Sequence, residues 1–167
     1  DDICKKREVE KQREAIEKNT VKMSDEQILQ KTNFKDGPRT AAMKGFIIEQ
    51  KFVDFVKNTK KTYIVKNNIM IGTHEYDVVA FANKTFEKDF VYEVKYLRNN
   101  ISLHQIERYR EQLKKLRTNF SEELNRLPYM TLAIVVPDER YEYTVNIVKQ
   151  IKKWNNYSIE IMKESDL

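Results

Sequence analysis

The chain has 167 residues, 40% of them hydrophobic, with only 3 Gly and 3 Pro; this excludes a disordered protein and suffices for one well-packed domain. Its net charge of +5, from 31 basic and 26 acidic residues, favours a polyanionic partner without requiring one. The single cysteine, Cys4, excludes an internal disulfide and a cysteine-based zinc site, and it fits the reducing cytoplasm. No apolar run is long enough to cross a bilayer. Because the sequence begins with Asp1, we expect a processed protein or a piece of a larger one.

The first 33 residues are rich in Lys, Glu, Gln and Arg, which predicts a charged helical arm or linker. We expect this arm to be solvated, and contact with nucleic acid or a partner protein is the alternative. The clearest break in the chain is Asp36-Gly37-Pro38. The predicted domains are therefore the arm over residues 1–38 and a folded domain over residues 39–167.

After this break, apolar residues recur at helical spacing over residues 40–57. Phe46, Val53 and Val56 share one face of the predicted helix, and Glu49 lies on that same face, where a carboxylate is out of place. Short β-prone runs at 63–65 and 69–71 follow. A strand is predicted at 76–81, then a polar connection and a further strand at 90–97.

The second half returns to a helical pattern over residues 102–117, with an apolar stripe along one face. Residues 131–136 form a continuous apolar run ended by Pro137, which predicts a strand covered on both faces and hence usually parallel to its neighbours. A helix over 141–154 and a strand over 157–162 complete the chain. The order α-β-β-β-α-β-α-β predicts an α/β fold with a mixed sheet flanked by helices.

Charged residues interrupt two of the apolar strands. Glu93 and Lys95 fall on one face of their strand, and Asp77 precedes the apolar run Val78–Phe81 in the strand before it. Burying a carboxylate and an ammonium is costly unless something compensates them. A divalent cation shared by Asp77 and Glu93, with Lys95 beside a reacting water, would compensate them and would make a phosphodiester-cutting site. The alternatives are a surface ion pair of Glu93 with Lys95 and a strand-edge role for Asp77.

Together, the order of elements and the charged residues on them resemble the PD-(D/E)XK nuclease superfamily, which has the restriction-endonuclease-like fold. The matching positions are Glu49 on the first helix, Asp77 on one strand and Glu93-Val94-Lys95 on the next. The resemblance covers residues 40–162. One departure is Tyr76, which stands where the family's proline precedes the aspartate. The resemblance implies an αβββαβ core with a further αβ unit.

The resemblance also implies roles for these residues in catalysis. Mg²⁺, or Mn²⁺ in its place, would be held by Asp77, Glu93 and the main-chain carbonyl of Val94, with Glu49 reaching the metal or its water shell. Lys95 would orient or help to deprotonate the attacking water and would stabilise the charge of the transition state.

Gln105 and Tyr109 are four residues apart and share a face of the predicted helix after the Glu93 strand. They resemble the Gln-x-x-x-Tyr signature of RecB-like members, which implies that the pair binds substrate near the active site. An equally supported alternative is structural: Ser102 to Gln105 reads as a capping box, and Tyr109 belongs to the apolar stripe. Both interpretations stay open.

The sequence as a whole predicts a Mg²⁺-dependent deoxyribonuclease, with DNA favoured over RNA and no membrane association. Basic residues near 57–61, 108–117 and 149–153 are solvated by default, and together they could contact phosphates. Cutting both strands of a duplex would often use a homodimer, and restriction, repair and anti-phage roles within a larger protein are all compatible. The alternatives are a catalytically silent nucleic-acid-binding or assembly module on the same fold and a structure-selective resolvase.

Overall fold

The computed structural model describes residues 38–151 and 153–167, so the predicted arm lies outside the described residues and the boundary at 38/39 stays a prediction. The chain divides into two compact units, residues 1–50 and 51–167. Helix α3 (Pro38–Thr59) is two residues longer at each end than predicted. Its start at a proline is favourable, because the first helical N–H has no acceptor within the helix.

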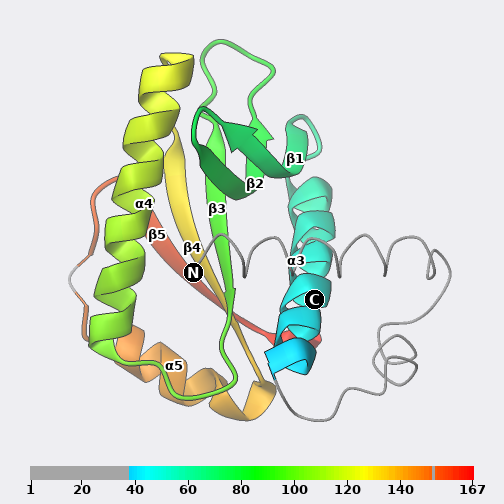
Figure 1. Ribbon diagram of the computed structural model, residues 1–167, viewed down its shortest axis with the longest axis vertical. Helices are drawn as coiled ribbons and strands as arrows, with labels where there is room; N and C mark the ends of the chain where they lie inside the picture. The colour runs from blue at the N-terminus through cyan, green and yellow to red at the C-terminus, as the bar shows by residue number, and fades with distance from the viewer. Residues whose placement is uncertain (1–37, 152) are drawn as a thin grey trace, which may run out of the picture. The chain divides into compact units, whose positions relative to one another are not determined.

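The second unit contains a five-stranded mixed sheet in the order β1-β2-β3-β4-β5 (Figure 1). The strands are β1 (Ile64–Ile71), β2 (His74–Phe81), β3 (Phe90–Tyr96), β4 (Tyr129–Val136) and β5 (Tyr157–Lys163). The first three form an antiparallel meander, whereas β3, β4 and β5 run parallel. The predicted α/β fold with a mixed sheet is confirmed. The two short runs predicted at 63–65 and 69–71 are a single strand, β1.

Strand β4 confirms the interpretation of the continuous apolar run. Every residue from Met130 to Val136 is buried, and the strand pairs in parallel with β3 on one side and β5 on the other. A strand that is covered on both faces has no solvated side on which polar residues would alternate. Pro137 follows immediately and ends the strand.

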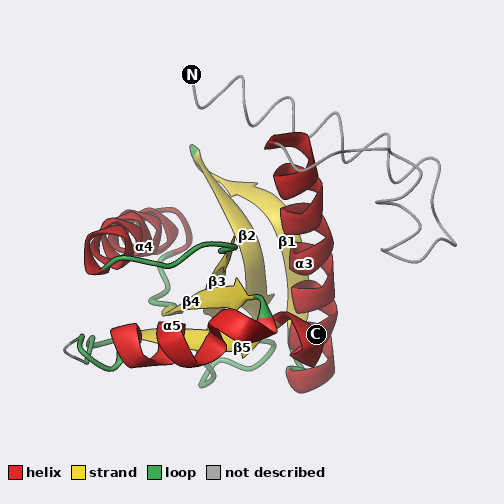
Figure 2. Cartoon of the chain, turned by 90° about the horizontal axis from the view of Figure 1, so that it is seen from below, coloured by secondary structure: helices red, strands yellow, loops and turns green. Residues whose placement is uncertain are grey.

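Helices cover both faces of the sheet (Figure 2). On one face α4 (Leu103–Leu124) packs through Leu113, Leu116 and Phe120. On the other, the part of α3 after residue 50 packs through Phe52 and its neighbours against β2 and β3. Helix α5 (Tyr141–Val148) follows the 3₁₀ turn η1 (Asp138–Arg140), and a second turn, η2 (Glu164–Asp166), ends the chain. None of the described helices is both long and apolar enough to cross a membrane.

Two helix boundaries differ from the sequence prediction. Helix α4 continues seven residues past 117, because Asn119 and Phe120 extend the buried stripe, and Asn125 then ends it in the left-handed conformation at φ 54°. Helix α5 ends six residues before Trp154, the predicted end. After it the chain makes tighter turns, in which Gln150 N–H donates to the Ile147 carbonyl at 3.2 Å.

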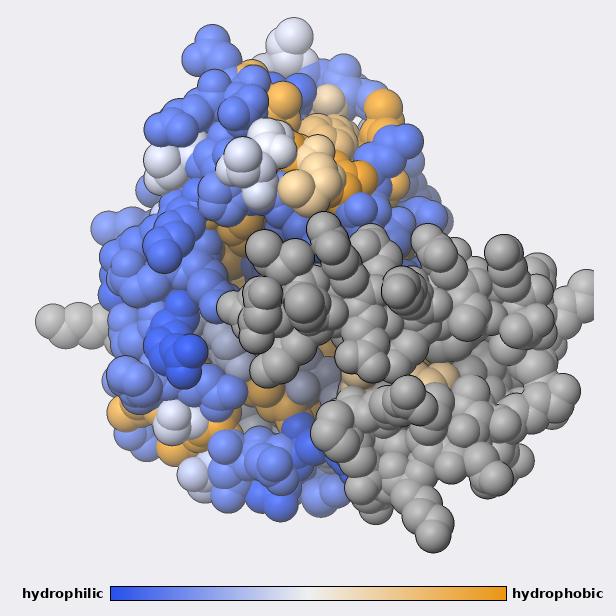
Figure 3. Space-filling model, viewed as in Figure 1, coloured by the Kyte–Doolittle hydropathy of each residue, from blue (hydrophilic) through white to orange (hydrophobic). Residues whose placement is uncertain are grey.

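Exposed apolar side chains gather near the β1–β2 hairpin on the face shown in Figure 3. Ile64 and Met70 of β1 are 49% and 62% exposed. Because β1 is an edge strand, these side chains lie at the margin of the sheet. The charged residues Asp77, Glu93 and Lys95 lie instead on β2 and β3, which have neighbours on both sides.

Phe52 makes the largest aromatic contribution to the core on the α3 side. It is fully buried, and its ring centre lies 5.5 Å from that of Tyr92 in an edge-to-face arrangement. We expect Phe52→Ala to lower the free energy of unfolding by about 3–5 kcal/mol because it leaves a cavity. The matched control is Phe86→Ala, since Phe86 is 81% exposed and its loss should change stability by about 0.5 kcal/mol or less. Urea denaturation followed by circular dichroism measures both, and equal effects would contradict the packing described.

Candidate active site

At Asp77, strand β2 loses its pairing with β3, and its pairing with β1 skips one position. Toward β3, the last register pair is Val78 with Tyr92. Toward β1, the register passes over Asn68, which would stand opposite Asp77 and which adopts a positive φ of 52°. Asparagine tolerates this conformation better than most residues. The backbone of Asp77 is therefore at a local interruption of the sheet.

Past the last register pair of β2 with β3, the Asp77 side chain supplies a hydrogen bond between the two strands in place of a main-chain bond. Its Oδ2 accepts a hydrogen bond of 2.9 Å from the main-chain N–H of Val94. This contact crosses from β2 to β3 just past the last register pair, and it aims the carboxylate at the segment that carries Glu93 and Lys95. The interruption thus places two acidic side chains from different strands next to each other.

Glu93 is buried among apolar residues on the α4 side of the sheet. Its neighbours in β3, Tyr92 and Val94, pack toward α3, so alternation directs Glu93 toward α4. The side chain is 9% exposed, and its Oε1 has no hydrogen-bond partner. Burial raises the pKa of the Glu93 carboxyl well above its usual value, the charge of Asp77 raises it further, and Lys95 opposes both. A proton or a bound cation would therefore stabilise this pair of carboxylates.

Lys95 lies beside Tyr109, which with Gln105 forms the predicted substrate-binding pair on α4. Its Nζ is 5.1 Å from the centre of the Tyr109 ring, and the Tyr109 hydroxyl accepts a hydrogen bond of 2.8 Å from Gln105 Nε2. Ser102 Oγ accepts from the main-chain N–H of Gln105 at 3.1 Å and caps the helix. The cap uses the backbone of Gln105 and the Tyr109 contact uses its side chain. The two sequence interpretations are therefore compatible, and substrate binding by this pair stays a prediction.

For two predicted metal ligands, Glu49 and the Val94 carbonyl, the described contacts do not test the predicted role. Glu49 lies on α3 in the first compact unit, is 8% exposed and interacts with other groups. The sequence predicts that the main-chain carbonyl of Val94 binds the metal. The structure describes a contact of the Val94 N–H, which donates to Asp77 Oδ2. Both assignments stay predictions.

The donor set fits a hard divalent cation. Within residues 38–151 and 153–167, no three His, Cys, Asp or Glu side chains are grouped to hold a metal. Asp77 and Glu93 remain, and Mg²⁺ characteristically binds through one or two carboxylates while it keeps several waters. The unpartnered Oε1 of Glu93 supplies a buried oxygen for such an ion. The arrangement therefore fits Mg²⁺ or Mn²⁺ better than Zn²⁺, which prefers nitrogen and sulfur ligands.

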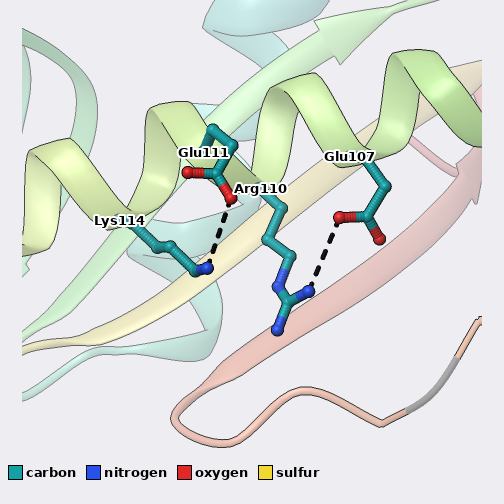
Figure 4. Close-up of polar contacts among 4 residues, drawn as sticks. All are labelled: Glu107, Arg110, Glu111 and Lys114. Atoms are coloured by element: carbon teal, nitrogen blue, oxygen red, sulfur yellow. Dashed lines mark hydrogen bonds and ion pairs between the residues drawn. The ribbon is translucent and has the colours of Figure 1, made fainter.

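Arg110 and Lys114 of α4 have acidic partners on their own helix (Figure 4). Arg110 pairs with Glu107 at 3.5 Å, and Lys114 pairs with Glu111 at 3.2 Å. Exposed pairs of this kind contribute little to stability. They do offset part of the positive charge of the helix.

Sequence reasoning did not identify Asn119 as part of the site's surroundings. Asn119 is 8% exposed, and its Nδ2 donates to the hydroxyl of Tyr76, the residue before Asp77, at 2.7 Å. The available signal was its position three residues after Leu116, which continues the buried stripe of α4. A buried asparagine on such a stripe normally has hydrogen-bond partners in the core.

No protein-family model matches the sequence, and no curated protein is similar to it. Among solved structures, the fold is similar to that of the restriction endonuclease PspGI in complex with its substrate DNA. The TM-score is 0.44 and the identity 14%, and the match covers 92% of this chain and 69% of that chain. This similarity concerns the course of the backbone alone.

Proposed function

We propose that this chain is a metal-dependent nuclease that hydrolyses phosphodiester bonds, with DNA as its substrate. The observation that carries the proposal is the buried Glu93 carboxyl, which has an unpartnered oxygen, next to the half-buried carboxyl of Asp77 and adjacent to Lys95. Two adjacent carboxylates, one of them buried, are unfavourable unless a cation is bound or one of them is protonated. A carboxylate pair that is destabilising without a cation and is neutralised by a hard cation is typical of metal-assisted hydrolysis.

Bound Mg²⁺ or Mn²⁺ would neutralise charge on the phosphoryl oxygens and make a water nucleophilic near neutral pH. Asp77 and Glu93 would hold the ion. Lys95 would orient the attacking water and stabilise the negative charge that develops on the phosphate. The Tyr109 ring lies against the Lys95 ammonium and restricts its position. Each role requires only residues that the structure brings together.

The direct test is cleavage of plasmid, linear duplex, single-stranded DNA and RNA with Mg²⁺, with Mn²⁺ and with chelator. We expect Asp77→Asn to reduce cleavage by at least about 10²-fold, because it removes a metal ligand's charge. The asparagine oxygen can still accept the Val94 N–H, so this change spares the local structure. Asp138→Asn is the matched control, since Asp138 is exposed on η1. Cleavage that survives Asp77→Asn, or that proceeds in chelator, would contradict the proposal.

A catalytically silent nucleic-acid-binding module is the second candidate, and it is favoured by the presence of only two clustered carboxylates in the described residues. Such a module would bind DNA without cutting it under any of these conditions. A structure-selective resolvase would use the same residues and would cut branched junctions in preference to linear duplex. Adding a branched substrate to the panel therefore separates all three activities.

A further inference from the structure

A buried hydrogen-bond cluster joins α4 to the residue that precedes Asp77. Tyr76 is fully buried, and its hydroxyl donates to the main-chain carbonyl of Leu116 at 2.7 Å. The Nδ2 of Asn119 donates to that hydroxyl at 2.7 Å and to the carbonyl of Ile71 at 2.8 Å. The cluster therefore links β1, β2 and α4 through one tyrosine and one asparagine.

The cluster lies where β2 is paired on one side only. Val78, after Asp77, has register partners in both β1 and β3, whereas Tyr76, before it, is paired only with Ile69 of β1. Tyr76 and Val79 both belong to the core under α4 although they are three residues apart, so the alternation of β2 is interrupted between them. On the N-terminal side of Asp77, the Tyr76 side chain therefore adds to the one-sided ladder with β1 in holding the backbone.

We propose that Tyr76 and Asn119 form an anchor on α4 that positions the Asp77 carboxylate. The anchor holds the backbone of Tyr76, and hence the start of Asp77, so that the Asp77 Oδ2 meets the Val94 N–H. Helix α4 also carries Tyr109 against Lys95, so one helix supports both sides of the candidate site. The consequence for metal binding rests on the proposed function, whereas the position of Asp77 can be measured without metal.

The first measurement follows the Val94 N–H by hydrogen exchange and NMR in the full chain without metal. Tyr76→Phe keeps the ring and removes the hydroxyl, and we expect it to speed exchange of the Val94 amide at least about 10-fold relative to the Leu132 amide of central strand β4. The matched control is Thr131→Val, which removes a different buried hydroxyl contact, 3.0 Å from Ser158 Oγ, and should leave this ratio unchanged. Asn119→Leu leaves the Tyr76–Leu116 bond in place and should act in the same direction with a smaller effect.

The second measurement titrates the same variants with Mn²⁺ by calorimetry. Tyr76→Phe should weaken Mn²⁺ binding by about 10-fold, as for other residues that orient metal ligands, and Thr131→Val should not. If Val94 exchange in Tyr76→Phe equals that of the wild type, the anchor is overturned whatever the metal result. If Val94 exchange responds but the wild type binds no Mn²⁺, the anchor stands and the metal-dependent function falls.

Discussion

Replacing Lys95 by alanine is expected to reduce Mg²⁺-dependent cleavage by about 10²–10⁴-fold, the range that a positioned proton-transfer group contributes. Lys95 is not a metal ligand in the proposed site, so Mn²⁺ affinity should change far less than the cleavage rate. Single-turnover cleavage and Mn²⁺ titration separate the two effects. Lys163→Ala is the matched control, because the Lys163 ammonium lies 5.1 Å from the Tyr141 ring, the same arrangement that Lys95 has with Tyr109. Wild-type cleavage by Lys95→Ala would contradict the assignment.

Lys95→Arg divides the role of the lysine further. Arginine keeps the positive charge and the contact with an aromatic ring, but it does not give up a proton near neutral pH. Recovery of cleavage in this variant would assign Lys95 to charge stabilisation. A rate as low as that of Lys95→Ala would assign it to proton transfer or to a water position that only an ammonium can hold.

Replacing Glu93 by glutamine is expected to raise the melting temperature of the metal-free protein by a few degrees at neutral pH while abolishing cleavage. Burial, and then the charge of Asp77, raises the folded-state pKa of Glu93. The stability that protonated Glu93 contributes is fully present below its unfolded pKa of about 4.3 and is lost as pH rises through the folded value. Glutamine resembles the protonated form and is not subject to this loss.

The test compares melting temperatures of wild type and Glu93→Gln at several pH values, with and without Mn²⁺. Without metal, the advantage of the glutamine variant should grow with pH. With Mn²⁺, the wild type should gain stability and the variant should not, because a ligand stabilises only the form that binds it. Glu160→Gln, an exposed carboxylate on β5, should follow the wild type throughout. A lower melting temperature for Glu93→Gln at neutral pH without metal would show that Glu93 is not a destabilising charge.

Much of the fold could be predicted because its signals are local. The apolar run that forms β4 and the turn residues between strands report directly on burial and on chain reversal. The end of α4 could not be predicted as well, because Asn119 looks polar in isolation. It is buried only because Tyr76 and Ile71 provide its hydrogen-bond partners, and these lie more than 40 positions earlier in the chain.

In the candidate site, too, local features could be predicted from the sequence and contacts between strands could not. Strand periodicity alone places Glu93 and Lys95 on one face, and the structure places Lys95 beside Tyr109. The bond from Val94 N–H to Asp77 could not be read from either strand, because it depends on where their ladder ends. The roles of these side chains in catalysis stay predictions for the variants described.

The sheet topology has a consequence for the order of folding. Short connections join the antiparallel strands β1 to β3, whereas β4 adds to β3 only after a crossover of residues 97–128. Because closing the longer connection loses more chain entropy, we expect the meander to form first, with Glu93 still exposed to water. Glu93 is removed from water only when α4 and β4 close over it. Because burial raises the pKa of Glu93, we expect this last step of folding to slow as pH rises when no metal is bound.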